Sequence, residues 1–133
     1  MSTQMSKFFD NILSKEQCGF RKGFNTQYCI LKMIEKWLES RDKGGRYGAL
    51  FTDLSKSFDC LIHELLIAKL HDYGFDLKLL NILHSSLTGR QHRTIMKNSF
   101  SLWHEILFGV PQGSILGPLL FNIYLCDFFI LLT

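Results

Sequence analysis

The sequence predicts an α+β fold (mixed α/β) in a single unit of 133 residues. Three stretches repeat apolar residues at helical spacing, over 30–38, 64–70 and 79–87. Two other regions, 47–53 and 90–108, have the apolar and β-branched character of strands. Hydrophobic residues make up 47% of the chain, which is enough for a core of its own.

The first predicted helix begins at Asn25 or Thr26, because either side chain can cap it, and Gly44-Gly45 ends it. Residues 47–53 then form a predicted short, buried strand, and 55–59 form a polar turn. The apolar face of this helix consists of Ile30, Leu31, Ile34, Trp37 and Leu38.

Two helices and a hairpin are predicted next. One helix covers 64–70 and is closed by Gly74, and the next runs from its cap at Asp76 to Gly89. Strands over 90–96 and 101–108 are expected to pair antiparallel about a turn near Asn98.

The C-terminal stretch 115–132 is apolar enough to raise the alternative of a membrane span. Pro118, Asn122 and Asp127 argue against it, because an acid at mid-span costs about 2.5–3.5 kcal/mol. We expect no membrane association, and instead a core helix with Pro118 in its first turn. Its buried face is predicted to hold Leu116, Leu119, Leu120 and Ile123.

Charge and cysteine content set only broad limits on function. The formal net charge of +3 is compatible with a nucleic-acid partner but does not require one. The spacing of Cys18, Cys29, Cys60 and Cys126 matches neither a zinc site nor a disulfide framework. We expect buried, reduced thiols in an intracellular protein, with nucleus and cytoplasm both open.

Asp53 is the first candidate for chemistry, because a buried carboxylate needs a partner or a metal. A structural cap of the next turn is favoured for a lone Asp, and a Mg²⁺ ligand is the functional alternative. Phe58 is either a core anchor or an aromatic wall beside a ligand. We expect Asp59 to cap the helix that contains Glu64, and His63 to be a polar residue near its start.

A loop rich in glycine and proline, 109–121, contains both prolines of the chain. Gly113 would let a ligand approach its backbone closely, and Gln112 offers both a donor and an acceptor. Ser114 is expected to cap the following helix. The loop is either a sharp turn or a ligand wall, and the hairpin should bring it beside Asp53.

Two basic patches complete the candidates. Arg21 and Lys22 lie between glycines, and the pattern fits either a phosphate-binding site or a solvated basic turn. Arg90, Arg93 and Lys97 lie on the predicted hairpin, where they would either follow a nucleic-acid backbone or form its solvated face.

Three segments together resemble the reverse transcriptase domain of non-LTR (LINE-type) retrotransposons. Residues 17–23 resemble the family's Gln-x-Gly-Phe-Arg block, 51–59 its first palm motif, and 109–121 its Gly-Val-Pro-Gln-Gly-Ser block. The resemblance implies a partial polymerase right hand, with a fingers portion over 1–48. The front half of the palm, with inserted helices and a hairpin, would occupy 49–133.

The resemblance also implies an activity, RNA-directed DNA polymerisation from dNTPs on an RNA template with a DNA primer. The resemblance implies that Asp53 and the backbone carbonyl of Leu54 bind the catalytic Mg²⁺. Phe58 would be the steric gate under the sugar. The resemblance also implies that Arg21 contacts the incoming triphosphate, with Lys22 as a weaker candidate. Gln112 and Gly113 would line the nucleotide and template site.

One departure from the family concerns the second acidic block, Tyr/Phe-Ala-Asp-Asp, which this sequence lacks. Two-metal catalysis needs more than one carboxylate, and Asp127 matches the residue before that block. We therefore expect a truncated, inactive domain, with a catalytically inactive nucleic-acid-binding remnant as the alternative function. The missing cover is expected to expose a surface for self-association, formed by Leu119, Phe121, Ile123, Phe128 and Phe129.

Overall fold

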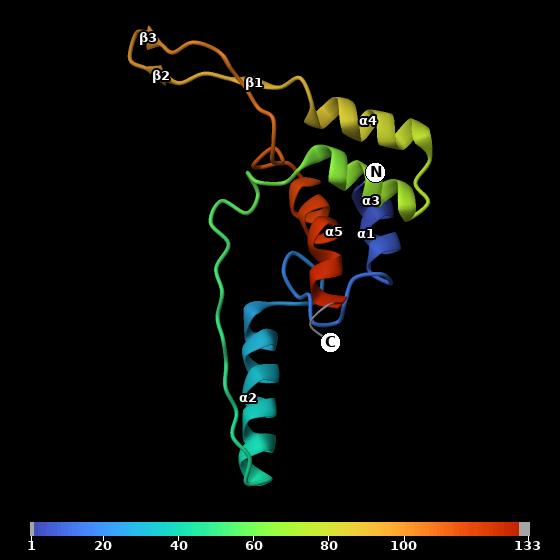
Figure 1. The fold of residues 1–133 in the computed structure, drawn as a ribbon, viewed down its shortest axis with the longest axis vertical. Helices are drawn as coiled ribbons and strands as arrows, with labels where there is room; N and C mark the ends of the chain where they lie inside the picture. The colour runs from blue at the N-terminus through green and yellow to red at the C-terminus, as the bar shows by residue number, and fades with distance from the viewer. Residues whose placement is uncertain (1, 131–133) are drawn as a thin grey trace.

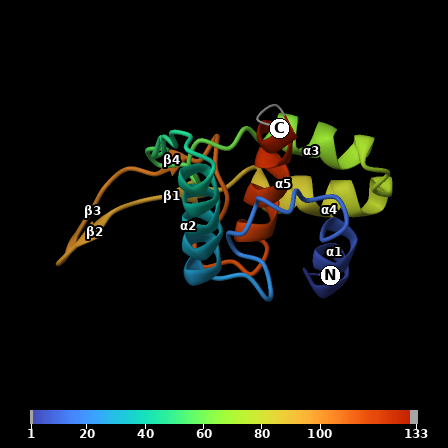
Figure 2. The same cartoon turned by 90° about the horizontal axis from the view of Figure 1, so that it is seen from below.

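The structure is a computed structural model that describes residues 2–130. Helices α1, α3, α4 and α5 gather into one bundle, and α2 and a β-hairpin project from it toward opposite ends of the molecule (Figure 1). The view from below again shows the hairpin extending away from the bundle (Figure 2). The helices are α1 (Ser2–Phe9), α2 (Thr26–Asp42), α3 (His63–Asp72), α4 (Leu77–Leu87) and α5 (Gly117–Ile130).

The core lies inside this bundle, where α3 packs on α4 and α5 and α1 packs on α5. Phe9 of α1 is fully buried and stacks on Phe75 with 5.4 Å between ring centroids. Helix α1 was not predicted from the sequence, yet it supplies the aromatic end of the core. The largest fully buried side chains are Phe9, Leu61, Leu66, Leu70, Leu83, Leu87 and Ile123.

The four later helices confirm the sequence prediction, and so do several of their ends. Asn25 Oδ1 accepts a hydrogen bond from the Tyr28 amide at 2.8 Å, as expected of an N-cap. Gly74 follows α3 with φ +83°. Asp76 occupies the N-cap position of α4, although its side chain makes no capping bond.

The predicted capping role of Asp59 is wrong. The N-cap residue of α3 is Ile62, and the Asp59 carboxylate instead accepts a hydrogen bond from Gln112 Nε2 at 3.0 Å. The carboxylate therefore joins the polar turn to the Gly/Pro loop.

The predicted buried strand over 47–53 is also wrong. The segment is extended but pairs with no strand among the described residues, and it returns from the end of α2 toward α3 (Figure 1). Leu50 is 89% exposed and Phe51 79% exposed. A strand needs a partner for its backbone groups, and no segment of residues 2–130 provides one. Asp53 is consequently exposed, and the argument from its burial no longer applies.

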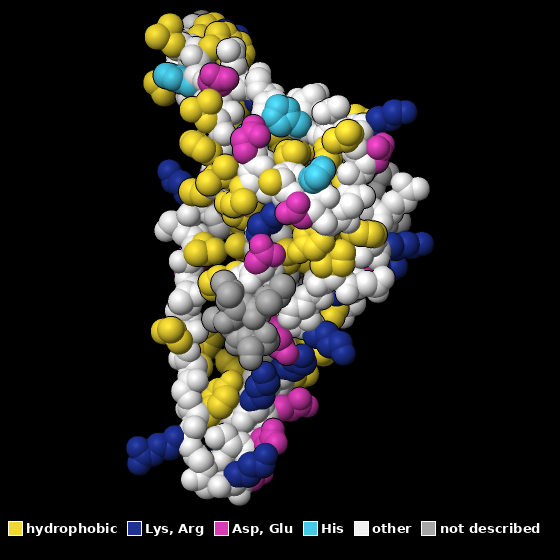
Figure 3. Space-filling view, turned by 45° about the vertical axis from the view of Figure 1, so that its right-hand side comes forward, with side chains coloured by type: hydrophobic (Ala, Val, Ile, Leu, Met, Phe, Trp, Pro, Cys, Tyr) yellow, Lys and Arg dark blue, Asp and Glu magenta, His cyan; other side chains and the backbone are white. Residues whose placement is uncertain are grey.

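The hairpin confirms the antiparallel pairing, but its ladders are shorter than predicted. β1 (Gln91–His92) pairs with β4 (His104–Glu105), and β2 (Ile95–Met96) pairs with β3 (Ser99–Phe100). Lys97 takes φ +54° at the turn. All four strands are exposed, and the hydrophobic side chains of β2 and β3 contribute to the apolar surface at the upper end of Figure 3.

Helix α5 is better covered than the sequence suggested. Leu119 and Ile123 are buried and Phe121 is half-buried, while Phe128 is 54% exposed. The side chain of Phe129 lies outside the described residues. The surface predicted for self-association is thus reduced, and self-association itself stays a prediction. Among residues 2–130, no helix has both the length and the apolar character needed to cross a bilayer.

The expectation of buried thiols is confirmed for only one of the four cysteines. Cys126 is buried, Cys18 is half-buried, and Cys29 and Cys60 are exposed.

The backbone at Gly109 joins the hairpin, the turn before α3 and the Gly/Pro loop. Its N–H donates to the Leu61 carbonyl at 2.8 Å. Its carbonyl accepts from Arg90 Nη2 and from His63 Nε2, each at 2.7 Å. Because a carbonyl only accepts, Nε2 of the buried His63 carries the proton. Gly109 has φ +81°, and a Cβ there would lie 2.7 Å from Asp59 Cα.

We predict that Gly109→Ala lowers the free energy of unfolding by more than about 3 kcal/mol, because it combines a left-handed φ with a backbone clash. Gly89→Ala is the matched control, since Gly89 has φ +67° and open space where a Cβ would lie. This control should cost about 1–2 kcal/mol. Urea titration measures both, and equal losses would contradict the packing argument.

Candidate functional site

Three of the predicted site residues, Phe58, Gln112 and Gly113, border one cleft of about 300 Å³. The cleft lies between the turn that follows the extended segment and the Gly/Pro loop. Its full lining is Phe20, Phe58, Pro111, Gln112, Gly113, Ser114, Ile115, Gly117 and Pro118. The loop was expected beside Asp53, but within this cleft it meets Phe58 and not Asp53.

Phe58 forms the aromatic wall of the cleft and is held on two sides. Its ring lies 4.5 Å from that of Phe121 on α5, and its carbonyl accepts from the Val110 amide at 3.0 Å. The ring of Phe20 meets it edge-on at 5.6 Å. Half-buried and braced in this way, Phe58 presents a rigid apolar surface to anything that enters the cleft.

The opposite wall is polar backbone. Gly113 has φ +82°, and nothing lies within 4 Å of the position that a Cβ would take, so a ligand can approach its main chain. The Gln112 side chain is exposed and held by Asp59. Ser114 Oγ accepts from the Gly117 amide at 2.9 Å, which confirms its predicted capping role at the start of α5.

Asp53 and Leu54 do not line this cleft. Both are exposed on the extended segment, and Asp53 makes no hydrogen bond or ion pair with the described residues. Within 2–130 there is also no group of three or more His, Cys, Asp or Glu side chains that could hold a metal ion. The residues present therefore do not fit a two-metal Mg²⁺ centre.

Arg21 is engaged inside the protein. Its Nη1 donates to the carbonyls of Ser14 at 2.7 Å and Gln17 at 3.1 Å, and its Nε lies 3.4 Å from Asp10 Oδ1. These bonds shape the loop between α1 and α2, so a triphosphate contact by Arg21 would require their release. Lys22 is exposed.

The same loop is anchored to α5 through two buried amides that sequence reasoning did not select as site residues. Gln17 Nε2 donates to the Asn122 carbonyl at 2.8 Å, and Asn122 Nδ2 donates to the Gly19 carbonyl at 2.7 Å. This pair places Phe20, the next residue, against Phe58. The available signal was an Asn within an otherwise apolar helix, because a buried amide requires partners.

The C-terminal end of α5 carries its own polar cluster. Lys69 Nζ lies 2.7 Å from Asp127 Oδ2, and this hydrogen bond holds the pKa of Asp127 below its usual value, against the opposing effect of burial. The pair therefore stabilises the fold above the ordinary carboxyl pKa and loses this effect as the pH falls through the lowered pKa. Burial and a hydrogen bond with Cys126 raise the pKa of Tyr73 nearby.

The basic hairpin residues divide into two groups. Arg90 serves the fold, since its Nε donates to the Leu87 carbonyl at 2.8 Å and its Nη2 binds Gly109. Arg93 lies over the rings of Phe100 and Trp103, 4.5 and 4.6 Å from their centroids. Lys97 is exposed at the turn. Nucleic-acid contact stays a prediction for all three cations.

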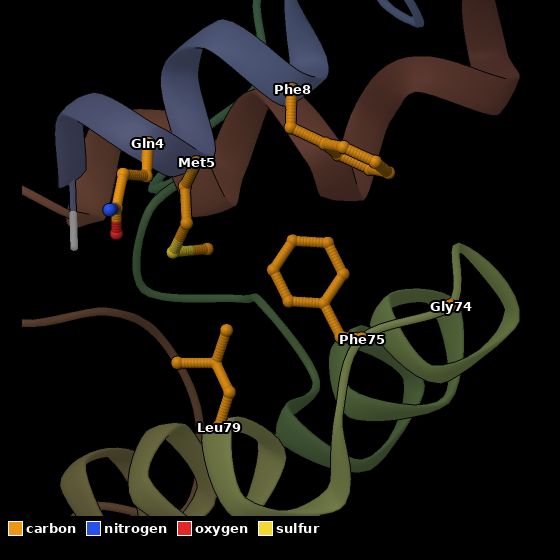
Figure 4. A pocket seen from close by; sticks show the side chains of 6 residues that line it. All are labelled: Gln4, Met5, Phe8, Gly74, Phe75 and Leu79. Atoms are coloured by element: carbon orange, nitrogen blue, oxygen red, sulfur yellow. The ribbon is translucent and has the colours of Figure 1, made fainter.

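A larger cavity of about 540 Å³ lies between α1 and the start of α4. Phe8 and Phe75 border it from opposite sides, and Gln4 is the one polar side chain in its lining (Figure 4). The described residues that line it include none of the predicted site residues and no titratable side chain.

Comparison with known proteins accounts for the motifs. A family model described as reverse transcriptase (RNA-dependent DNA polymerase) matches residues 1–133. The chain belongs to the reverse transcriptase family. It is 34% identical over 116 residues to the probable RNA-directed DNA polymerase from transposon BS of Drosophila melanogaster, which covers 87% of this chain and 13% of that protein.

Two further relatives are also retrotransposon polymerases. Identity is 33% over 116 residues with the probable RNA-directed DNA polymerase from transposon X-element of Drosophila melanogaster, covering 87% of this chain and 13% of that protein. Identity is 30% over 115 residues with the RNA-directed DNA polymerase from mobile element jockey of Drosophila funebris. This match covers 86% of this chain and 12% of that protein. This reverse transcriptase chain thus spans about an eighth of the length of the curated relatives it matches.

We predict that Asn122→Ala frees the loop and lowers the free energy of unfolding by about 0.5–1.5 kcal/mol, because the partly buried hydrogen bond to the Gly19 carbonyl is lost. Trypsin should then cleave faster after Arg21 and Lys22. The control is Asn81→Ala, at an exposed position of α4. Unchanged cleavage in Asn122→Ala would contradict the anchoring role.

Proposed function

We propose that this chain supplies the fingers portion, 1–48, and the front half of the palm, 49–133, of an RNA-directed DNA polymerase. In this proposal the cleft beside Phe58 is the nucleotide-binding wall. The supporting observation is that Phe58, Gln112 and Gly113, which come from two separate motifs, border a single cleft. The proposed partners are a dNTP, an RNA template and a DNA primer.

The proposed roles follow from the chemistry of each wall. The braced ring of Phe58 would pack under the sugar and leave no space for a 2′-hydroxyl. The open backbone at Gly113 would let a base pair pass close to the main chain. Gln112, fixed by Asp59, would present its amide at the edge of the cleft.

Catalysis needs more than these residues. We propose that Asp53 and the Leu54 carbonyl are one side of the metal site of a complete reverse transcriptase. Two-metal nucleotidyl transfer requires further carboxylates, and the described part of the chain holds no group of three or more His, Cys, Asp or Glu side chains that could bind a metal ion. The chain by itself should therefore bind a nucleotide without joining it to a primer.

Photolabelling tests the nucleotide wall. With an azido-dATP probe, we predict labelled peptides from 109–118 and from the turn that contains Phe58, with dATP competing about tenfold better than ATP. Phe58→Val should remove this preference, because it removes the ring that excludes the 2′-hydroxyl. Phe8→Val, at an exposed phenylalanine outside the cleft, is the control and should retain the preference.

Primer extension on an RNA template with Mg²⁺ separates binding from catalysis. We expect no incorporation above background. Robust synthesis that Asp53→Ala abolishes would contradict the proposed absence of catalysis by this chain. Labelling spread evenly over the surface would contradict the nucleotide wall.

The alternative function, a nucleic-acid-binding remnant without catalysis, rests on the hairpin. Arg93 lies over Phe100 and Trp103, with Lys97 at the tip of an exposed, projecting ribbon. A cation among aromatic faces can contact a phosphate while the rings stack on bases. This surface could act without any metal site.

For the hairpin, we predict that Arg93→Ala and Lys97→Ala each weaken binding to an RNA–DNA hybrid. Each should reduce the slope of log affinity against log salt by about 0.7–0.9, the loss of one phosphate contact. Fluorescence anisotropy across a salt series provides the measurement. Lys78→Ala, at an exposed lysine of α4, is the control, and an equal effect there would contradict a binding surface on the hairpin.

A further inference from the structure

Two cysteines from neighbouring segments meet beside the start of α2. Cys18 lies in the loop between α1 and α2, and Cys29 lies in the first turn of α2. Both border one cavity of about 200 Å³, and Cys29 is near enough to raise the pKa of the Cys18 thiol. Cys18 Sγ donates a hydrogen bond to the Lys15 carbonyl at 3.9 Å, and the two thiols share this small cavity.

The surroundings make this pair accessible. Cys29 is exposed and Cys18 is half-buried. Lys32 and Glu16 form an ion pair at 3.5 Å on the same cavity. Burial, and then the neighbouring Cys29 thiol, raise the pKa of the Cys18 thiol, while Lys32 opposes this effect.

A disulfide between the two cysteines would join two parts of the fold that differ in how firmly they are held. Cys18 lies between Gln17 and Gly19, the two residues that Asn122 binds on α5. Helix α2, in contrast, buries no residue against the described part of the chain. The thiols thus lie where a firmly anchored loop meets a helix with little packing of its own.

We propose that Cys18 and Cys29 form a redox-active dithiol, a modification site at which an intramolecular disulfide fastens α2 to the anchored loop. This site is independent of the proposed polymerase function.

The reaction is thiol–disulfide exchange with a low-molecular-weight disulfide such as glutathione disulfide. The thiolate of Cys29, the more exposed sulfur, attacks one sulfur of the oxidant, and one glutathione thiolate leaves. The thiolate of Cys18 then attacks Cys29 Sγ in the mixed disulfide, and the second glutathione leaves. Two electrons pass to the oxidant, and the two thiol protons end on the released glutathiones.

The test uses the whole chain in glutathione redox buffers, followed by digestion without reductant and mass spectrometry. We expect a peptide linked between Cys18 and Cys29 that lacks two hydrogens. Exposed Cys60 provides the internal comparison and should carry only a mixed disulfide. The second step is intramolecular. The Cys18–Cys29 disulfide should therefore form at a ratio of oxidised to reduced glutathione about tenfold lower than the ratio at which the Cys60 adduct forms.

Variants and a second measurement keep the proposal falsifiable. Cys18→Ser should convert the linked product into a glutathione adduct on Cys29, while Cys60→Ser should leave the link unchanged. Amide hydrogen exchange in the first turns of α2 should slow on oxidation and recover with reductant. A stable adduct on Cys29 in the unaltered chain, equal linkage to Cys60, or a disulfide without slower exchange would each overturn the proposal.

Discussion

The fold depends on the close approach of Gly109 to the turn that precedes α3. At this point the main chain has a left-handed conformation and lies too near Asp59 and Phe58 to admit a side chain. Its amide and carbonyl then bind Leu61, His63 and Arg90, so that three segments share one residue. The cleft follows from this junction, because Val110 and Gln112 continue directly from it and bind Phe58 and Asp59.

Local signals in the sequence predicted the elements that local interactions build. Asn25 and Ser114 cap helices as expected, since a cap involves residues only three apart in the chain. The predicted strand over 47–53 was wrong because a strand depends on a partner that is distant in the sequence. Its apolar residues fit a buried strand, but a strand forms only beside a partner, and no partner is present in residues 2–130. Tertiary context thus decided the conformation that pattern alone could not.

The candidate site was predictable in part. The motif containing Phe58 and the motif containing Gln112 were each recognisable, and the predicted hairpin was expected to bring the second back toward the first. Arg21 shows why the rest was not. A cation between glycines has the same sequence pattern whether it binds a phosphate or the carbonyls of its own loop, as it does here. Likewise, nothing near Asn122 in the sequence identifies Gly19, 103 residues away, as its partner.

The isolation of α2 has a consequence for how the chain melts. A helix of 17 residues that buries none of them depends on its own backbone bonds and end caps, whereas in proteins most of a helix's stability comes from tertiary packing. The bundle, by contrast, shares one core. We therefore expect helix α2 to unfold in a separate transition before the bundle. A single melting temperature should then not describe this molecule.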